Sequence, residues 1–134
     1  MTTAMPMIDE RDAGAEVKAV FDDIRTSRNT DYINNFWRVL ANDPGTLTRI
    51  WAGLKQVMAP GALDSLTKEM IYLAISISNG CAYCSHSHGA AAKGKGMTKE
   101  MFAELLAIVG MANQTNKLAD GYRVPVDEAF QNLF

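Results

Sequence analysis

The sequence predicts an all-α fold of about six to seven helices, forming one domain over residues 1–134. Two observations favour this fold. Apolar residues recur at helical spacing along most of the chain, and no stretch shows the clear period-two alternation that is typical of strands. Asn, Pro and Gly clusters then divide the chain into segments of helix length. A chain of this length can bury a core without disulfide staples.

The first half of the chain is expected to hold three helices after an irregular arm over residues 1–14. Residues 27–30 are expected to form a loop, and the sequence Asn42-Asp43-Pro44-Gly45 a turn. Pro60 and Gly61 end the third helix. The first helix is predicted from Val17, Val20, Phe21 and Ile24, the second from Phe36, Trp37 and Leu40, and the third from Leu47, Ile50, Trp51, Leu54, Val57 and Met58.

A fourth helix begins at a cap, Asp64 or Ser65. Its residues 70–77 are apolar on nearly all sides, which indicates a buried helix, although periodicity alone does not exclude a buried strand. A fifth helix begins at or just before Cys81 and ends at Gly94-Lys95-Gly96.

Thr98 caps a sixth helix, which residues 113–120 either extend or follow as a separate helix. Val124 and Pro125 open a last short segment. That segment ends in Phe130 and Leu133. The buried face of the sixth helix is expected to comprise Phe102, Leu105, Leu106 and Val109.

Composition narrows the classes of partner. The formal net charge is −2, which gives no reason to expect nucleic acid or an anionic membrane surface as a partner. No apolar run reaches the roughly 18 residues that a membrane span needs. Residues 1–10 lack a signal pattern, so we expect a cytoplasmic protein. In that compartment a cysteine pair is more often catalytic, redox-sensing or metal-binding than structural.

Both cysteines and both histidines of the chain lie within eight residues, Cys81 to His88. On a helix, Cys81, Cys84 and His88 share one face, because they are three, four and seven residues apart. Cys81 lies in the first turn, where the helix dipole favours a thiolate. His88 can take a proton from Cys84 or stabilise its thiolate.

Glu69 is the only acidic residue between Asp64 and Glu100. Its apolar neighbours predict partial burial, which would raise the pKa of the carboxyl group towards neutrality and suit it to proton exchange.

Three other interpretations of the cysteine pair remain open. It could be an inert buried pair, or it could bind a metal with His88 and with Glu69 or His86 as a fourth ligand, although the usual zinc pattern is incomplete. It could also follow a strand over residues 70–77 in a thioredoxin-like fold. We expect His86 to be a surface or interface residue. The tryptophans Trp37 and Trp51 are expected to pack in the core or an interface, and Lys93, Lys95 and Lys99 to form a solvated helix end.

Glu69, followed by eleven residues and then Cys81-X2-Cys84-X3-His88, resembles the alkylhydroperoxidase D (AhpD) motif of the carboxymuconolactone decarboxylase-like superfamily. The segments Leu66-Thr-Lys-Glu-Met-Ile-Tyr-Leu-Ala and Gly89-Ala-Ala-Ala-Lys-Gly-Lys-Gly-Met-Thr resemble it too. The good match covers residues 66–109, and residues 35–54 resemble the peroxidase-related branch more weakly.

This resemblance implies an all-α fold that assembles as a trimer or a hexamer. It implies a peroxidase or disulfide reductase, in which Cys84 attacks the peroxide or disulfide, Cys81 is the resolving thiol and proton donor, and His88 and Glu69 form a proton relay. A thiol-dependent activity of this type predicts a lowered pKa at Cys84. The resemblance implies no cofactor beyond the redox-active Cys81–Cys84 disulfide, which an external dithiol would reduce. Decarboxylation is not expected, because the lactone decarboxylases of the superfamily lack the cysteine pair.

One position departs from the family pattern. The best-known members carry His immediately before the second cysteine, whereas this chain carries Tyr83. A tyrosine hydroxyl, with an ordinary pKa near 10, donates a hydrogen bond but is a poor base at neutral pH. We therefore expect Tyr83 to be at most an auxiliary residue and turnover to be slow. A redox-sensing or metal-binding module without turnover, on the same helical fold, is the alternative.

Overall fold

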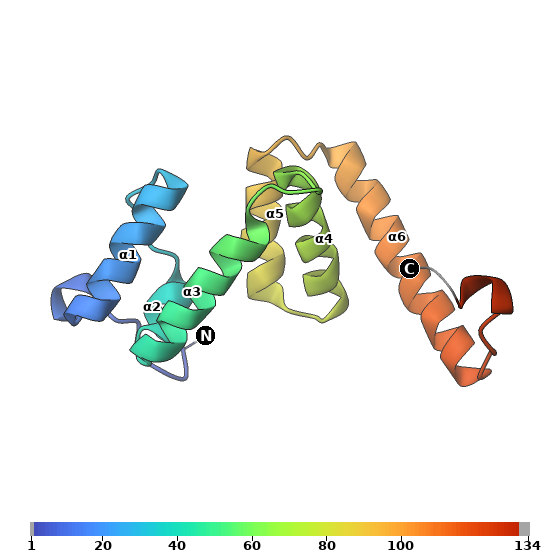
Figure 1. The fold of residues 1–134 in the computed structure, drawn as a ribbon, viewed down its shortest axis with the longest axis horizontal. Helices are drawn as coiled ribbons and strands as arrows, with labels where there is room; N and C mark the ends of the chain where they lie inside the picture. Colours follow the sequence, from blue (N-terminus) through green and yellow to red (C-terminus); the bar gives the residue numbers. More distant parts are fainter. Residues whose placement is uncertain (1, 132–134) are drawn as a thin grey trace. The chain divides into compact units, whose positions relative to one another are not determined.

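The computed structural model describes residues 2–131, and in that range every regular element is a helix. The all-α prediction is therefore confirmed, and the alternative strand over residues 70–77 and the thioredoxin-like fold are excluded. The helices are α1 (Ala15–Arg28), α2 (Asn35–Leu40), α3 (Pro44–Met58), α4 (Ser65–Ser78), α5 (Ala82–Gly94) and α6 (Lys99–Gly121), with short 3-10 helices η1 (Glu10–Asp12) and η2 (Glu128–Phe130) (Figure 1).

The chain divides between Ala59 and Pro60 into two compact units. The assignment of residues 1–134 to one domain stays a prediction. The candidate site lies wholly in the second unit, which contains α4, α5 and α6.

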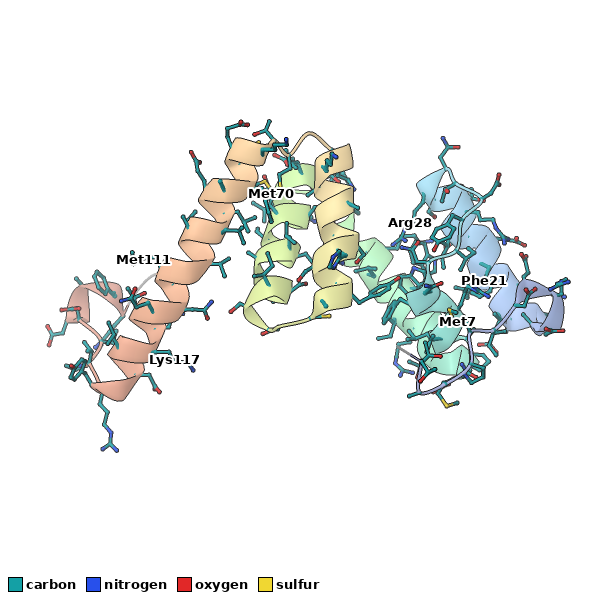
Figure 2. The ribbon with its side chains drawn as sticks, turned by 180° about the vertical axis from the view of Figure 1, so that it is seen from behind. Met7, Phe21, Arg28, Met70, Met111 and Lys117 are labelled. Carbon is teal, nitrogen blue, oxygen red and sulfur yellow. The ribbon has the colours of Figure 1, made fainter. Side chains whose placement is uncertain are left out.

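The first unit is a core of helix-borne apolar side chains. All four residues that predicted α1 are buried, and Phe21 is among the most deeply enclosed side chains of the chain (Figure 2). Trp37 and Trp51 meet edge to face, with ring centroids 5.3 Å apart, and the Trp51 indole N–H donates to Asp23. The tryptophans are therefore core residues, as expected.

Two boundaries in this unit differ from the prediction. Ser27 and Arg28 belong to α1, whose end is set by Asn29 in the left-handed conformation. The turn predicted over residues 42–45 contains the start of α3, because Asp43 accepts the N–H of Thr46 and Pro44 occupies the first helical position.

In the second unit, α4 and α5 lie side by side (Figure 1). Asp64 caps α4, which settles the choice between Asp64 and Ser65. Small residues of α5 face α4: Ala92 is fully buried, and a Cβ added at Gly89 would lie 3.7 Å from Leu73. This close packing fixes the position of α5 relative to α4, the two helices that carry the candidate site.

The helix α6 begins at Thr98, as predicted, and residues 113–120 extend it. The prediction of its buried face is wrong in part, because only Leu105 is buried. Figure 2 shows side chains projecting from α6, with Met111 and Lys117 labelled. The prediction that α4 is buried on all sides is also wrong in part, since Ile75 is 54% exposed. The last short segment corresponds to η2, and Leu133 lies outside the described residues.

Among residues 2–131, no helix combines the length and the apolar character that crossing a membrane requires.

Candidate active site

The turn between α4 and α5 places the first cysteine at a helix start. Gly80 has φ of +72°, a left-handed conformation that favours glycine, and it lets the chain reverse after Asn79. The N–H of Cys81 then donates to the carbonyl of Ser76 at 2.9 Å. Cys81 is thereby fixed as the N-cap of α5, one residue before the helix that the sequence predicted to contain it.

The two cysteines form a hydrogen-bonded dithiol. The Cys81 sulfur accepts the backbone N–H of Cys84 at 3.4 Å and also the Cys84 thiol. Both donors stabilise a negative charge on Cys81, so its pKa is lowered. The hydrogen bond to Cys81, together with burial, raises the pKa of Cys84 to about 11. We expected the lowered pKa at Cys84, and this direction is wrong: Cys81 is the first thiol of the pair to ionise.

Glu69 and His88, which the family resemblance pairs in a proton relay, are in direct contact. His88 Nδ1 lies 2.7 Å from Glu69 Oε2, and the exposed fractions of the two side chains are 15% and 8%. Burial acts to raise the pKa of Glu69, but the hydrogen bonds from His88 and Lys95 outweigh it, so the pKa is lowered. The expectation of a carboxyl group titrating near neutrality is therefore wrong, and Glu69 is a carboxylate.

The charge of Glu69 fixes the tautomer of His88. A carboxylate has no proton to donate, so Nδ1 of His88 must carry the hydrogen of their shared bond. Nε2 is then the nitrogen of the neutral ring that can take a proton. The pair thus presents a base oriented by an acidic partner.

Two residues of this site escaped the sequence analysis. The Tyr72 ring stacks on His88, with centroids 3.7 Å apart and planes inclined by 22°. Lys95 Nζ lies 3.1 Å from Glu69 Oε1, whereas Lys95 was expected to belong to a solvated helix end. The signals were present, because Tyr72 follows Glu69 by three residues and Lys95 follows His88 by seven, which are spacings that share a helix face.

The other two candidates lie at the surface. Tyr83 is 42% exposed. His86 is exposed and its Nδ1 donates to the carbonyl of Ala82 at 2.7 Å, so its expected surface position is confirmed. A search of the described residues finds no group of three or more His, Cys, Asp or Glu side chains arranged to hold a metal ion.

A cleft of about 580 Å³ lies in the second unit next to the dithiol helix. Its wall on α5 includes Ser85, Gly89 and Lys93, which are displaced around the helix from the face that carries Cys84 and His88. Its wall on α6 includes Phe102 and Leu106. The cleft therefore borders the candidate site without containing the sulfur atoms.

Comparison with known proteins assigns the chain to a family. Residues 44–127, more than half of the chain, match the model of the Carboxymuconolactone decarboxylase family. The chain belongs to this family. Glu69, Cys81, Cys84 and His88 all lie within the residues matched.

A solved structure narrows the assignment within the Carboxymuconolactone decarboxylase family. The chain is 54% identical to a protein whose crystal structure is described as the alkylhydroperoxidase AhpD core from Rhodospirillum rubrum. The two structures superpose with a TM-score of 0.93, covering 97% of this chain and 98% of the other. The chain is therefore AhpD-like in fold, as the motif indicated. None of the curated proteins compared with the chain matches it.

Proposed function

We propose that this protein is a thiol-dependent peroxidase or disulfide reductase that cycles between the Cys81–Cys84 dithiol and its disulfide. The observation that carries the proposal is the hydrogen-bonded dithiol at the start of α5, on the same helix face as a histidine oriented by a buried carboxylate. A nucleophile with a base, and a third group that orients the base, is the arrangement that covalent catalysis requires.

The first step reduces the peroxide at Cys84. Because the pKa of Cys84 is raised and Cys81 is the first of the two thiols to ionise, Cys84 needs a base before it can react. His88 takes the proton, and the Cys84 thiolate attacks the terminal peroxide oxygen. The O–O bond breaks, Cys84 becomes a sulfenic acid, and the leaving alkoxide takes the proton from His88 as an alcohol.

The second step closes the disulfide. The Cys81 thiolate attacks the Cys84 sulfur, and the hydroxide that leaves is protonated to water. The peroxide has then gained two electrons and the dithiol has lost two. An external dithiol returns two electrons and two protons to complete the cycle, and we place this cycle in the cytoplasm, where thiols are kept reduced.

We further propose that the protein works as a homo-oligomer, a trimer or a hexamer. The support is the apolar surface of the second unit: Ile108 on α6 is 68% exposed and Ile75 on α4 is 54% exposed. Exposed apolar patches of this kind mark association surfaces.

Single-turnover reduction of tert-butyl hydroperoxide by the reduced protein tests the proposed activity. Wild type is expected to consume peroxide and to form the Cys81–Cys84 bond, detected by mass spectrometry. Cys84→Ser should lose the reaction, whereas Cys81→Ser should still reduce the peroxide once but stop at the Cys84 sulfenic acid. Full activity of Cys84→Ser would overturn the proposal. No peroxide loss, but ready oxidation by a small disulfide, would leave only the reductase or a redox sensor.

A further inference from the structure

Lys95 is the one cation whose ammonium group contacts the carboxylate of the candidate site within the described residues. Its Nζ lies 3.1 Å from Glu69 Oε1, while the other oxygen of the same carboxylate accepts from His88. Glu69 therefore bridges a lysine and a histidine through its two oxygens. The side chain of Glu69 is only 8% exposed, so a negative charge on its carboxylate requires hydrogen-bonding or charged partners of this kind.

The backbone at Lys95 is fixed independently of the ion pair. Lys95 is the C-cap of α5, and its N–H donates to the carbonyls of Ala91 and Ala92, both at 3.1 Å. The next residue, Gly96, has φ of +109°, which ends the helix there, and Met97 donates back to Ala92. The lysine thus lies seven residues, about two turns, after His88, on the helix face that the dithiol and His88 share.

We propose that Lys95 is a positioning residue that acts through Glu69 to fix His88 with Nδ1 as donor and Nε2 as proton acceptor. With Lys95 in place, Glu69 keeps its negative charge beside the histidine as the pH falls, so it continues to accept from Nδ1. Without Lys95, burial of the carboxyl group is opposed by His88 alone. The role of Nε2 in catalysis rests on the proposed function, whereas the assignment of the His88 tautomer is independent of it.

The titratable groups that face Glu69 determine the pKa of its carboxyl group. On α5 and its cap they are His88 and Lys95, and both lower the pKa of Glu69. On α4 the neighbouring titratable group is Tyr72, whose pKa is raised by burial, by the two cysteines and by Glu69. Loss of the Lys95 charge should therefore raise the pKa of Glu69.

The direct test follows the carboxyl carbon of Glu69 by NMR as a function of pH. The expected result is a midpoint below the ordinary value of about 4.3 in wild type and a clearly higher midpoint in Lys95→Met. Lys95→Arg keeps the charge, so it should keep the low midpoint. Lys93→Met removes a lysine from the same helix end, away from Glu69, and serves as the matched control. An unchanged midpoint in Lys95→Met, or an equal rise in Lys93→Met, would overturn the proposal.

A second measurement ties the lysine to the reaction. The acid limb of the single-turnover rate should move to higher pH in Lys95→Met, so the loss of rate should be largest at low pH, and Lys95→Arg should restore the wild-type profile. A merely structural ion pair would lower the rate by the same factor at every pH, and that result would contradict a positioning role. If wild type reduces neither the peroxide nor a small disulfide, the proposed function fails, and the NMR midpoint alone still decides whether Lys95 controls Glu69.

Discussion

At the scale of single residues, the two thiols differ because one of them caps a helix. Cys81 accepts hydrogen bonds from the Cys84 thiol and from backbone N–H groups, so its pKa is lowered, whereas Cys84 donates to it and its pKa is raised to about 11. The first proton to leave the pair is therefore that of Cys81, and the remaining proton stays on Cys84. In the proposed reaction this asymmetry explains the need for a base such as His88, because the attacking sulfur must first lose that proton.

Single-cysteine variants test this origin of the asymmetry. In Cys81→Ala the main cause of the raised pKa is gone, so the pKa of Cys84 should fall from about 11 towards its ordinary value of about 8.5, staying above it because burial persists. In Cys84→Ala the pKa of Cys81 should rise towards that value, since the thiol donor is lost. The rate of alkylation against pH measures both. A Cys84 midpoint that stays near 11 in Cys81→Ala would show that burial dominates.

The sequence was sufficient to find Glu69, Cys81, Cys84 and His88, because helical spacing and residue chemistry are both written in it. It was insufficient to predict the directions in which the pKa values of Cys84 and Glu69 shift. Those depend on which hydrogen-bond donors reach Cys81 and Glu69, and the donors come from the fold. Lys95 was missed because a lysine near a helix end is usually solvated, and its spacing from His88 places it on the same helix face without showing that it reaches Glu69.

At the scale of elements, the caps place the helices of the second unit. Thr98 accepts the N–H of Met101 at 3.1 Å at the start of α6. Thr98→Ala should lower the free energy of unfolding by about 1 kcal/mol through the loss of this cap. Thr115→Ala makes the same substitution at an exposed interior position of α6 and should not lower it, because alanine is the better helix former. Chemical denaturation measures both, and equal losses would contradict the role of the cap.

Helix existence was predictable from apolar periodicity, and the caps Asp64 and Thr98 were predictable from residue type. The buried faces of α4 and α6 were not. Periodicity shows which side of a helix is apolar, but it does not show whether the residues that pack against that side belong to the same chain. On α6 the apolar residues Leu106, Ile108, Met111 and Leu118 remain exposed in the single chain.

At the scale of the whole molecule, α6 argues for association between copies. A helix of 23 residues with Leu105 as its buried side chain gains little from packing within its own chain, although packing supplies most helical stability in proteins. Ile108→Glu should therefore dissociate the oligomer, measured by sedimentation equilibrium. Lys117→Glu also adds negative charge to the exposed surface of α6 and should leave it assembled. A wild-type protein that is monomeric at micromolar concentration would contradict the proposal.

The central claim is that Cys81 and Cys84 act as one two-electron unit, and the stoichiometry of a single turnover tests it most directly. Fully reduced protein is mixed with excess tert-butyl hydroperoxide, and the peroxide consumed and the thiols lost are counted in the same sample. The account predicts one peroxide consumed and two thiols lost for each chain, with a Cys81–Cys84 disulfide as the product. Loss of both thiols without that disulfide, or peroxide consumption that leaves both thiols intact, would contradict it.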